Sequence, residues 1–317
     1  MRIAILDDYQ GVALKMADWS RLQRAHEIVV FRKPFAGADE VVRALADFEV
    51  ISAMRERTPF PRSVLERLPK LKLLVSTGHW NAAIDVKAAA ERGIVTAGTP
   101  STGHAAFELS IAMLMCVARQ IHVEHQSVRE GGWQVGVGND LFGTTLGVIG
   151  LGRIGAQMAK VGRAFGMKVI AWSQNLSEER ARECGAQRVE KAELFSKSDY
   201  VTVHVKLSER TRGLVGAAEI ALMKPTAYLV NTARGPIVDE KALIAALNEG
   251  RIAGAALDVF DIEPLPADHV LRRTPRVLLT PHIGYVSQAS YKDFYGGTVK
   301  AIEDWLAGRP VDHPLKG

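Results

Sequence analysis

Three polar clusters in the second half of the chain each fall at or just after the end of a predicted strand. They are Asn231–Gly235 (Asn-Thr-Ala-Arg-Gly), Asp258–Pro264 (Asp-Val-Phe-Asp-Ile-Glu-Pro) and Thr280–Gly284 (Thr-Pro-His-Ile-Gly). Hydride transfer between an alcohol and a nicotinamide needs a base for the hydroxyl proton, a partner that holds the base, and a cation for the substrate's oxygens. A neutral imidazole, a paired carboxylate and a planar guanidinium have these properties. The histidine, glutamate and arginine of the clusters supply those three parts.

A glycine-rich turn precedes these clusters. Residues 145–155 read Thr-Leu-Gly-Val-Ile-Gly-Leu-Gly-Arg-Ile-Gly, an apolar run that leads into three spaced glycines. Gly150 permits a tight turn, Gly152 lets the backbone approach phosphate oxygens, and Gly155 lets the next helix pack closely on the strand. Such triplets also occur in ordinary strand-to-helix turns. Here a helix-like stretch and a second strand follow, which favours a site for a dinucleotide pyrophosphate at the helix N-terminus.

Strand-like runs alternate with helical stretches, which predicts an α/β protein of two Rossmann-like domains with doubly wound parallel sheets. Ligands of such sheets bind beyond the carboxyl ends of the strands, so we expect the active site in the interdomain cleft. The first series of strands is Ile3–Leu6, Glu27–Phe31, Val50–Ala53 and Leu73–Ser76; the second is Thr145–Ile149, Lys168–Trp172, Tyr200–Val205, Ala227–Asn231, Gly254–Val259 and Val277–Leu279.

Two helical segments connect these series. One long helix is predicted from about His104 to Glu130, and another over Ser287–Leu306 could return to cover the first domain. The predicted domains are a substrate domain of residues 1–98 plus 287–317 and a dinucleotide-binding domain of residues 99–286.

The composition of the chain narrows the class of protein. Its 317 residues are 47% hydrophobic and 24% charged, with a net charge of +5, which is ordinary for a globular protein. Basic and acidic residues are interspersed, so no nucleic-acid partner is predicted. Cys116 and Cys184 lack metal-ligand spacing, and we predict no metal site. The N-terminal apolar run is too short for a signal peptide, and Leu109–Ala118 is about half a membrane span, so we expect a cytoplasmic protein without a membrane segment.

Together the motifs resemble those of the D-isomer-specific 2-hydroxyacid dehydrogenases, which include glyoxylate/hydroxypyruvate reductases and D-3-phosphoglycerate dehydrogenases. The resemblance covers nearly the whole chain. It implies an NAD(P)-dependent oxidoreductase that transfers hydride between the nicotinamide and C2 of a D-2-hydroxy or 2-keto acid, working as a 2-keto acid reductase. The matching residues are Gly150–Gly155, Asn231–Gly235, Ala256–Phe260 with Glu263 and Pro264, and Pro281–Gly284.

The resemblance also implies roles for single residues. Arg234 binds substrate, Glu263 pairs with the base, His282 is the acid/base, and Asp258 lies near the nicotinamide carboxamide; taken singly, each could instead be structural. Backbone amides around Thr77 and Gly78 are expected to hold the keto acid. His204, at the end of a predicted strand, is either a core histidine or a cofactor contact. The implied cofactor-binding set is Gly150, Gly152, Arg153, Ile154, Gly155, Ser173, Gln174, His204, Thr232, Ala233, Asp258 and Gly284; the substrate-binding set is Arg55, Thr77, Gly78 and His79.

The chain departs from the family pattern at the end of the second strand of the glycine-rich unit. NAD-preferring members usually carry an Asp there that accepts hydrogen bonds from the adenosine ribose, whereas this chain has Ser173-Gln174-Asn175. Without the carboxylate, a ribose 2′-phosphate meets no like charge, and Arg153 or Arg180 could reach it. The sequence therefore slightly favours NADP(H) over NAD(H).

A second departure concerns the substrate pocket. Arg55 aligns with a substrate-facing Arg of the family, although Arg55 and Arg57 could also be surface residues that flank Glu56. His79 and Trp80 stand where many members carry Tyr-Asp. The identity of the 2-hydroxy acid is therefore not inherited from the resemblance.

Two other functions are compatible with the same fold. One is a dinucleotide-sensing binding protein without significant turnover, like the corepressors related to this family. The other is a formate dehydrogenase, but those resembling enzymes use Gln where this chain has Glu263. The resemblance also implies a homodimer, with the helix from about His104 to Glu130 and the Gly131-Gly132-Trp133 segment as the contact; the alternative is a helix buried within one chain.

Overall fold

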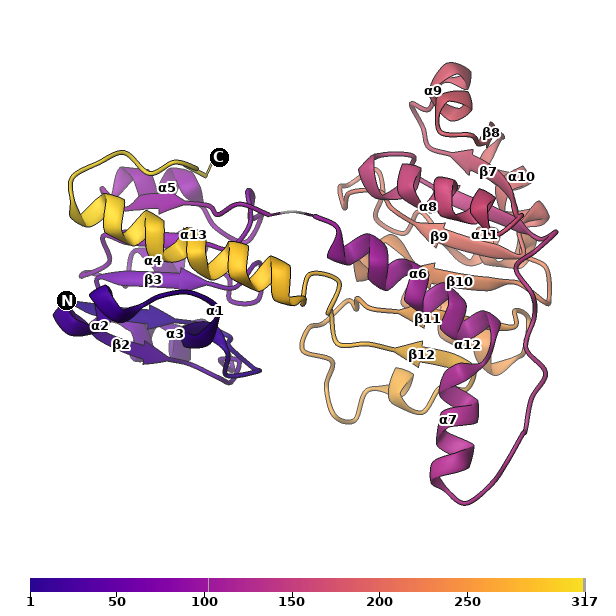
Figure 1. The fold of residues 1–317 in the computed structure, drawn as a ribbon, viewed down its shortest axis with the longest axis horizontal. Helices are drawn as coiled ribbons and strands as arrows, with labels where there is room; N and C mark the ends of the chain where they lie inside the picture. The colour runs from indigo at the N-terminus through magenta and orange to yellow at the C-terminus, as the bar shows by residue number, and fades with distance from the viewer. Residues whose placement is uncertain (102, 316–317) are drawn as a thin grey trace. The chain divides into compact units, whose positions relative to one another are not determined.

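A computed structural model describes residues 1–101 and 103–315, and the chain divides into two compact units (Figure 1). One unit comprises Met1–Gly103 with Val286–Gly317, and the other comprises His104–Tyr285. The described residues between 99 and 103 thus belong with the first unit, not with the predicted dinucleotide-binding domain, and so does Val286. The reason at Thr99 is direct: its hydroxyl accepts from the Gly78 N–H (2.8 Å) and its own N–H donates to the Gly78 carbonyl (3.0 Å). The ligands assigned to the two domains, and the cleft between them, stay predictions.

The first unit is built on a parallel sheet with the strand order β2-β1-β3-β4-β5. The central strands β3 and β4 are buried at every residue, as expected for strands covered on both faces. The four predicted strands are present, and the short edge strand β5 adds a fifth. The strands are β1 (Arg2–Ile5), β2 (Glu27–Val30), β3 (Val50–Ala53), β4 (Leu73–Ser76) and β5 (Val95–Ala97).

Helices from both ends of the chain cover this sheet. The long helix α13 begins after Ser287, whose hydroxyl accepts the Ser290 N–H at 3.2 Å, and packs against β4 and the short helix α1. The C-terminal helix is therefore part of the first unit. The helices are α1 (Ala13–Met16), α2 (Ser20–Ala25), α3 (Ala38–Leu45), α4 (Arg62–Leu65), α5 (Val86–Glu91) and α13 (Gln288–Leu306).

The second unit contains a larger parallel sheet with the order β12-β11-β10-β9-β6-β7-β8. The direction of winding reverses beside β6, the strand that leads into the glycine-rich turn, and such switch points bind ligands. All six predicted strands are present, and the two-residue edge strand β8 was not predicted. The strands are β6 (Thr145–Ile149), β7 (Lys168–Trp172), β8 (Gln187–Arg188), β9 (Tyr200–Val203), β10 (Tyr228–Asn231), β11 (Gly254–Leu257) and β12 (Val277–Leu279).

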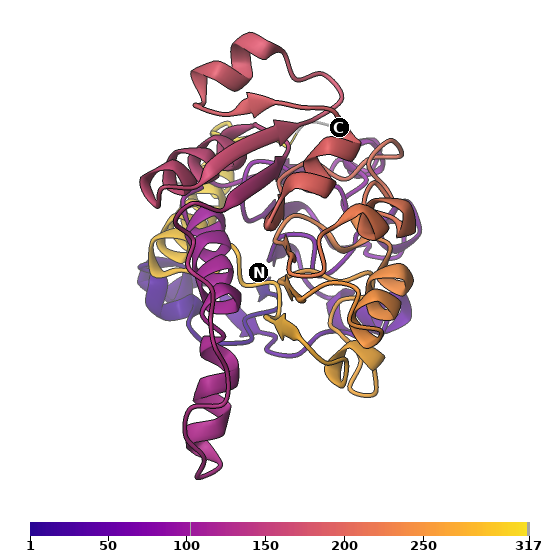
Figure 2. The ribbon, with the colours of Figure 1, turned by 90° about the vertical axis from the view of Figure 1, so that its right-hand side faces the viewer.

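Helices cover both faces of this sheet. Helices α6 and α8 pack together on one face, while α10 and α11 lie against the other, with α12 beside α11 (Figure 2). Helix α8 begins at Arg153, directly after Gly152 of the glycine-rich turn. The helices are α6 (Ala105–Ala118), α7 (Ile121–Arg129), α8 (Arg153–Ala164), α9 (Glu178–Glu183), α10 (Lys191–Lys197), α11 (Ala217–Leu222) and α12 (Glu240–Asn248), with 3-10 turns η1 (Gly235–Ile237) and η2 (Val270–Arg272).

The single helix predicted from about His104 to Glu130 is wrong, because the chain breaks between α6 and α7. Gln120 adopts a left-handed conformation (φ 51°), and the two helices are bent by 66°. Helix α6 buries apolar side chains up to Ala118, whereas α7 buries none, so the break falls where packing on the sheet ends. Figure 2 shows α7 projecting away from the rest of the second unit. Among the described residues no single helix is long and apolar enough to span a membrane; only the bent pair α6 and α7 passes that test, and only jointly.

Candidate active site

The three polar clusters follow three neighbouring strands of the second sheet. Hydrogen bonding between neighbouring strands continues past the strand ends: the Asp258 N–H donates to the Asn231 carbonyl (3.0 Å) and the Thr280 N–H donates to the Leu257 carbonyl (2.9 Å). The loops after β10, β11 and β12 therefore begin side by side at one edge of the sheet. The fold brings the predicted Arg, Glu and His to adjacent loops.

His282 and Glu263 form a direct pair. His282 Nδ1 lies 2.5 Å from Glu263 Oε2, and Glu263 Oε1 accepts the Phe260 N–H at 2.9 Å. Because an ionised carboxylate can only accept, the pair places the proton of a neutral imidazole on Nδ1 and leaves Nε2 as the basic nitrogen. The two side chains are 23% and 32% exposed, so a small molecule can reach them.

Asp258 fixes the turn that carries His282. Its Oδ1 accepts from the Thr280 hydroxyl (2.6 Å) and the Ile283 N–H (2.8 Å), and its Oδ2 accepts from the Gly284 N–H (2.8 Å). Burial raises the pKa of Asp258, and the Thr280 hydrogen bond is the largest of several effects that oppose the rise. Since these bonds lie on both sides of His282, which itself has a left-handed backbone (φ 51°), the carboxylate holds the orientation of the imidazole.

Arg234 lies in a loop that Asn231 organises. Asn231 Oδ1 accepts the Ala233 N–H and its Nδ2 donates to the Arg234 carbonyl, both at 3.0 Å. A Cβ at Gly235 would lie 2.1 Å from the Phe260 carbonyl carbon, so only glycine lets this loop rest on the backbone that leads to Glu263. The guanidinium donates to the Ala233 carbonyl at 2.7 Å.

Thr232, predicted to contact the cofactor, joins the same loop to helix α6. Its hydroxyl lies 2.7 Å from the Ser110 hydroxyl, which also donates to the Ala106 carbonyl. Helix α6 therefore supports the predicted cofactor-binding loop from outside the motif.

The glycine-rich turn has the shape that a pyrophosphate needs. Gly150 has φ +91°, and a Cβ there would lie 2.8 Å from the His204 carbonyl oxygen; a Cβ at Gly155 would lie 2.0 Å from the Gly150 oxygen. At Gly152, in contrast, a Cβ would meet nothing within 4 Å. Helix α8 starts at the next residue, Arg153, followed by Ile154, and no side chain caps its N–H groups. Open space beside an uncapped helix N-terminus fits a bound phosphate group.

Ser173 and Gln174 follow the strand next to this turn. The Gly150 N–H donates to the Trp172 carbonyl at 2.9 Å, which places the end of β7 beside the glycines. Ser173 is partly exposed and Gln174 is exposed. Both side chains are therefore accessible where the family's ribose-binding acid would stand.

His204 follows β9 on the other side of the glycine-rich turn. Its Nε2 lies 2.8 Å from the Thr202 hydroxyl, and burial lowers the pKa of the ring to about 3. His204 is therefore neutral at physiological pH and already has a partner. These features fit the alternative interpretation of His204, a structural histidine with its hydrogen bond made within the fold. Its contact with the cofactor stays a prediction.

The predicted substrate residues of the first unit gather at the carboxyl ends of β3 and β4. Arg55 has a left-handed backbone (φ 52°), and its N–H donates to the Thr77 hydroxyl at 2.9 Å while Nη1 donates to the Thr77 carbonyl at 3.2 Å. The guanidinium covers Gly78, where a Cβ would lie 1.9 Å from Arg55 Nη1. His79 follows, with an exposed side chain.

The expectation that backbone amides around Thr77 and Gly78 hold the keto acid is corrected for these two residues. The Thr77 N–H donates to the Ala53 carbonyl (3.0 Å) and the Gly78 N–H donates to the Thr99 hydroxyl. Both donors are used within the fold, so these residues support Arg55, and the side chains of Arg55 and His79 are left as the predicted contacts.

The sequence reasoning missed three residues that build these loops. Asn231 and Thr280 hold the Arg234 and His282 loops, and Asn81 Nδ2 donates to the Arg55 carbonyl (2.7 Å) and the Ser76 hydroxyl (2.9 Å). Asn231 and Thr280 stand inside the recognised clusters, so their position in the motifs was an available signal. Asn81 carries no such signal.

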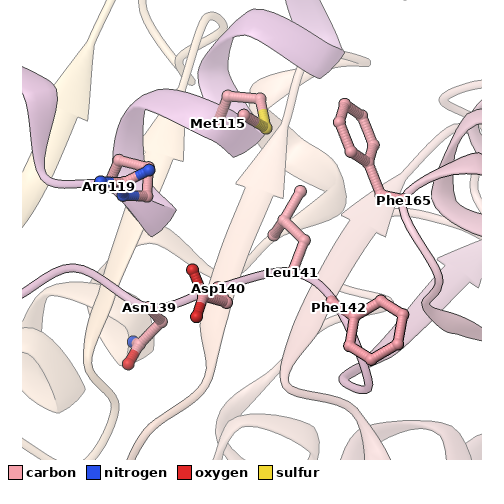
Figure 3. A pocket seen from close by; sticks show the side chains of 7 residues that line it. All are labelled: Met115, Arg119, Asn139, Asp140, Leu141, Phe142 and Phe165. Carbon is pink, nitrogen blue, oxygen red and sulfur yellow. The ribbon is translucent and has the colours of Figure 1, made fainter.

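A pocket of about 210 Å³ lies elsewhere in the second unit (Figure 3). The residues that line it precede β6 or end α6 and α8, so it lies at the opposite edge of the sheet from the loops that carry the three polar clusters. No predicted site residue lines it. Within residues 1–101 and 103–315, no group of three or more His, Cys, Asp or Glu side chains could hold a metal ion. The lining residues are Met115, Arg119, Asn139, Asp140, Leu141, Phe142 and Phe165.

Comparison with known proteins gives consistent matches. The model of the D-isomer specific 2-hydroxyacid dehydrogenase NAD binding domain matches residues 111–284. A hydroxypyruvate reductase of Blautia hydrogenotrophica is 32% identical over 98% of this chain and 99% of its own length. A D-3-phosphoglycerate dehydrogenase of Synechocystis is 36% identical over 86% of this chain. The crystal structure of a phosphoglycerate oxidoreductase from Vibrio cholerae O395 superimposes with a TM-score of 0.92 at 33% identity, covering 97% of this chain and 99% of that one.

The lengths of the relatives differ. The chain spans about half the length of two curated D-3-phosphoglycerate dehydrogenases that it matches, 49% of the one from Synechocystis and 54% of the one from Methanocaldococcus jannaschii. The domain match nevertheless covers more than half of this chain and ends at Gly284, so it includes the glycine-rich turn and all three polar clusters. The chain therefore belongs to the D-isomer specific 2-hydroxyacid dehydrogenase family.

Proposed function

We propose that the protein is an NAD(P)-dependent D-2-hydroxyacid dehydrogenase that works as a 2-keto acid reductase in the cytoplasm. The observation that carries the proposal is the His282–Glu263 pair at 2.5 Å, held on the carboxyl edge of the same sheet that presents the glycine-rich turn. A base with a fixed proton on Nδ1 and a dinucleotide-binding turn are the two parts that this reaction requires.

In this proposal, each candidate residue of the second unit has a separate role. Gly150, Gly152 and the N-terminus of α8 would hold the pyrophosphate, and a bound nicotinamide dinucleotide supplies the hydride. Arg234 binds the carboxylate of the keto acid through its guanidinium fork. Protonated His282 gives its Nε2 proton to the oxygen of the forming alcohol, and Glu263 stabilises the imidazolium before that transfer.

The proposal also includes a preference between NADP(H) and NAD(H). No carboxylate stands among Ser173, Gln174 and Asn175, and Arg153 at the start of α8 is exposed and makes no ion pair with the described residues. Arg180, the other candidate for the 2′-phosphate, pairs with Glu183 at 3.1 Å. These features favour NADP(H) modestly over NAD(H).

The test is oxidation of NADPH and NADH at neutral pH with glyoxylate, hydroxypyruvate, pyruvate and larger 2-keto acids. We expect turnover with at least one keto acid and faster turnover with NADPH. The relatives named hydroxypyruvate reductase and glyoxylate reductase make hydroxypyruvate and glyoxylate the first substrates to try. Dinucleotide binding with no turnover across the panel would contradict the reductase and support a sensor.

The proposed partner is a second copy of the chain. Helix α7 buries no residue, and the segment after it exposes Trp133 (73%) and Val137 (89%). Exposed apolar side chains gathered in one region mark an interaction surface.

A further inference from the structure

The segment that follows α13, residues 309–315, lies along the edge of the first sheet. Pro314 forms an antiparallel bridge with Ala97, and the Gly98 N–H donates to the His313 carbonyl at 2.6 Å. Leu315 is buried in the core of the first unit. Figure 1 shows this segment running back from α13 over the same unit.

Charged contacts fix the other end of the segment. Buried Asp304 accepts from Arg309 Nε (2.9 Å) and Nη2 (2.6 Å), and from Lys300 Nζ (2.6 Å). Lys300 also pairs with Asp312 at 2.8 Å. The segment is therefore attached at both ends and not only by its backbone bonds to β5.

This segment contacts the loop that carries the predicted substrate residues. The His313 and His79 rings meet edge to face, with centroids 5.7 Å apart and planes at 80°. The His79 side chain makes no hydrogen bond or ion pair with the described residues, so this ring contact is what orients it. An aromatic contact of this geometry shifts a conformational equilibrium about 2- to 10-fold.

Backbone contacts also connect the segment 309–315 to the loop that carries His79. A Cβ at Gly98 would lie 2.6 Å from the Gly78 oxygen and 3.5 Å from the His313 oxygen, so Gly98 is enclosed between the loop and the segment. Thr99, the next residue, exchanges two hydrogen bonds with Gly78. A displacement of the segment at His313 therefore reaches Gly78 through one intervening residue.

We propose that His313 is a positioning residue that holds His79 and its loop in the arrangement that binds the keto acid. The proposal rests on the proposed function in one respect only, namely that the loop contacts substrate. It makes the affinity for the keto acid depend on a segment more than 200 residues away in the sequence.

The kinetic test compares three variants. In His313→Ala we expect the KM for the keto acid to rise about 3- to 10-fold, with kcat within about 2-fold and the KM for the dinucleotide unchanged. His313→Phe keeps an edge-to-face ring and should restore the wild-type KM. Pro310→Ala, in the same exposed segment but away from His79, is the matched control and should behave as wild type.

Hydrogen–deuterium exchange separates this proposal from the proposed function. The Gly78 N–H is bonded to Thr99, and the Ala83 N–H is bonded to the Asn81 side chain (2.8 Å). Exchange of a peptide spanning residues 77–83 should be faster in His313→Ala than in wild type, and normal in His313→Phe and Pro310→Ala. Equal exchange in His313→Ala and wild type would overturn the proposal, whether or not the protein turns over a keto acid.

Discussion

At the scale of single residues, the short contact between His282 and Glu263 defines what each side chain contributes. Replacing His282 by Ala removes the proposed proton donor, so turnover should fall roughly 100- to 10,000-fold. The glycine-rich turn does not involve His282, and the Kd for the dinucleotide should stay near that of the wild type. Stopped-flow turnover and fluorescence titration of the reduced dinucleotide measure the two effects. Undiminished turnover would remove His282 as the acid/base.

Glu263→Gln tests the same pair of residues with a milder change than His282→Ala. The amide still bonds to the ring but carries no charge to stabilise the imidazolium, and a charge-assisted hydrogen bond exceeds a neutral one by an amount worth about 10-fold in rate. We expect a loss of that size, well short of the loss in His282→Ala.

Ser173 is the residue that we propose to lie beside the cofactor's ribose. Replacing Ser173 by Asp restores the like charge that repels a 2′-phosphate, because this residue lies at the end of β7 beside the glycines. The ratio of kcat/KM for NADPH to that for NADH should fall at least about 10-fold. Ser173→Asn, equal in size but neutral, is the control. If both substitutions leave the ratio unchanged, the residue does not face the ribose.

Asp7 gives the first unit a pH dependence. It is buried, accepts from the Thr58 hydroxyl (2.7 Å) and the Tyr9 hydroxyl (3.2 Å), and burial raises its pKa against those hydrogen bonds. A raised pKa means that folding favours the protonated acid. Asp7 therefore contributes its full stabilisation at pH values below its pKa in the unfolded chain, about 4. This contribution is lost as the pH rises through the pKa of Asp7 in the folded protein.

Asp7→Asn isolates this effect, since Asn tolerates the left-handed backbone at this position (φ 57°) and does not titrate. The variant should gain stability relative to wild type as the pH rises from 4 to 7. Asp258, whose pKa is also raised, is present in both proteins and cancels in the difference. Urea unfolding across this range measures the free energies; parallel curves for the two proteins would contradict the assignment.

At the scale of elements, one strand–turn–helix unit contains two glycines with separable roles. Gly155→Ala forces a Cβ to within 2.0 Å of the Gly150 oxygen and should destabilise the fold by about 1–3 kcal/mol. Gly152→Ala meets no protein atom within 4 Å and should leave the melting temperature unchanged. Its methyl group instead occupies the space that we propose for the phosphate, so the dinucleotide Kd should rise at least about 10-fold. Calorimetry of both variants checks this; a lower melting temperature in Gly152→Ala would show that the space serves folding.

The sequence predicted most elements because buried parallel strands such as β3 and β10 are mostly apolar runs, with a single polar residue in each. The exceptions have physical causes. Strands β5 and β8 are two- or three-residue edge strands with too few side chains to show a pattern. The break at Gln120 contains neither Gly nor Pro and arises where helix packing ends. Likewise, motifs pointed to Arg234, Glu263 and His282 as candidate site residues. The hydrogen bonds of the Thr77 and Gly78 amides could not be predicted, because their partners lie far away in the sequence.

At the scale of the whole molecule, a surface of apolar side chains extends over α7 and the segment up to Val137. The segment is held against α7: the Glu124 carboxylate accepts the Gly136 N–H at 2.8 Å, and the Ser127 hydroxyl donates to the Trp133 carbonyl at 2.8 Å. An ordered segment that exposes apolar side chains in one chain is expected to bury them against another. The exposed side chains are Ile121, Val123, Val128, Trp133, Val135 and Val137.

This surface predicts that the wild-type protein is a dimer of the 34.5 kDa chain at micromolar concentration. Val137→Asp places a charge where the partner's apolar side chains would lie, and because Val137 is 89% exposed in one chain, the fold itself should not change. Light scattering should therefore report a monomer for Val137→Asp with an unaltered circular dichroism spectrum. Val270→Asp, which alters an equally large and half-exposed side chain in η2, is the matched control and should remain dimeric. A monomeric wild type would instead mean that α7 and its segment serve a different partner.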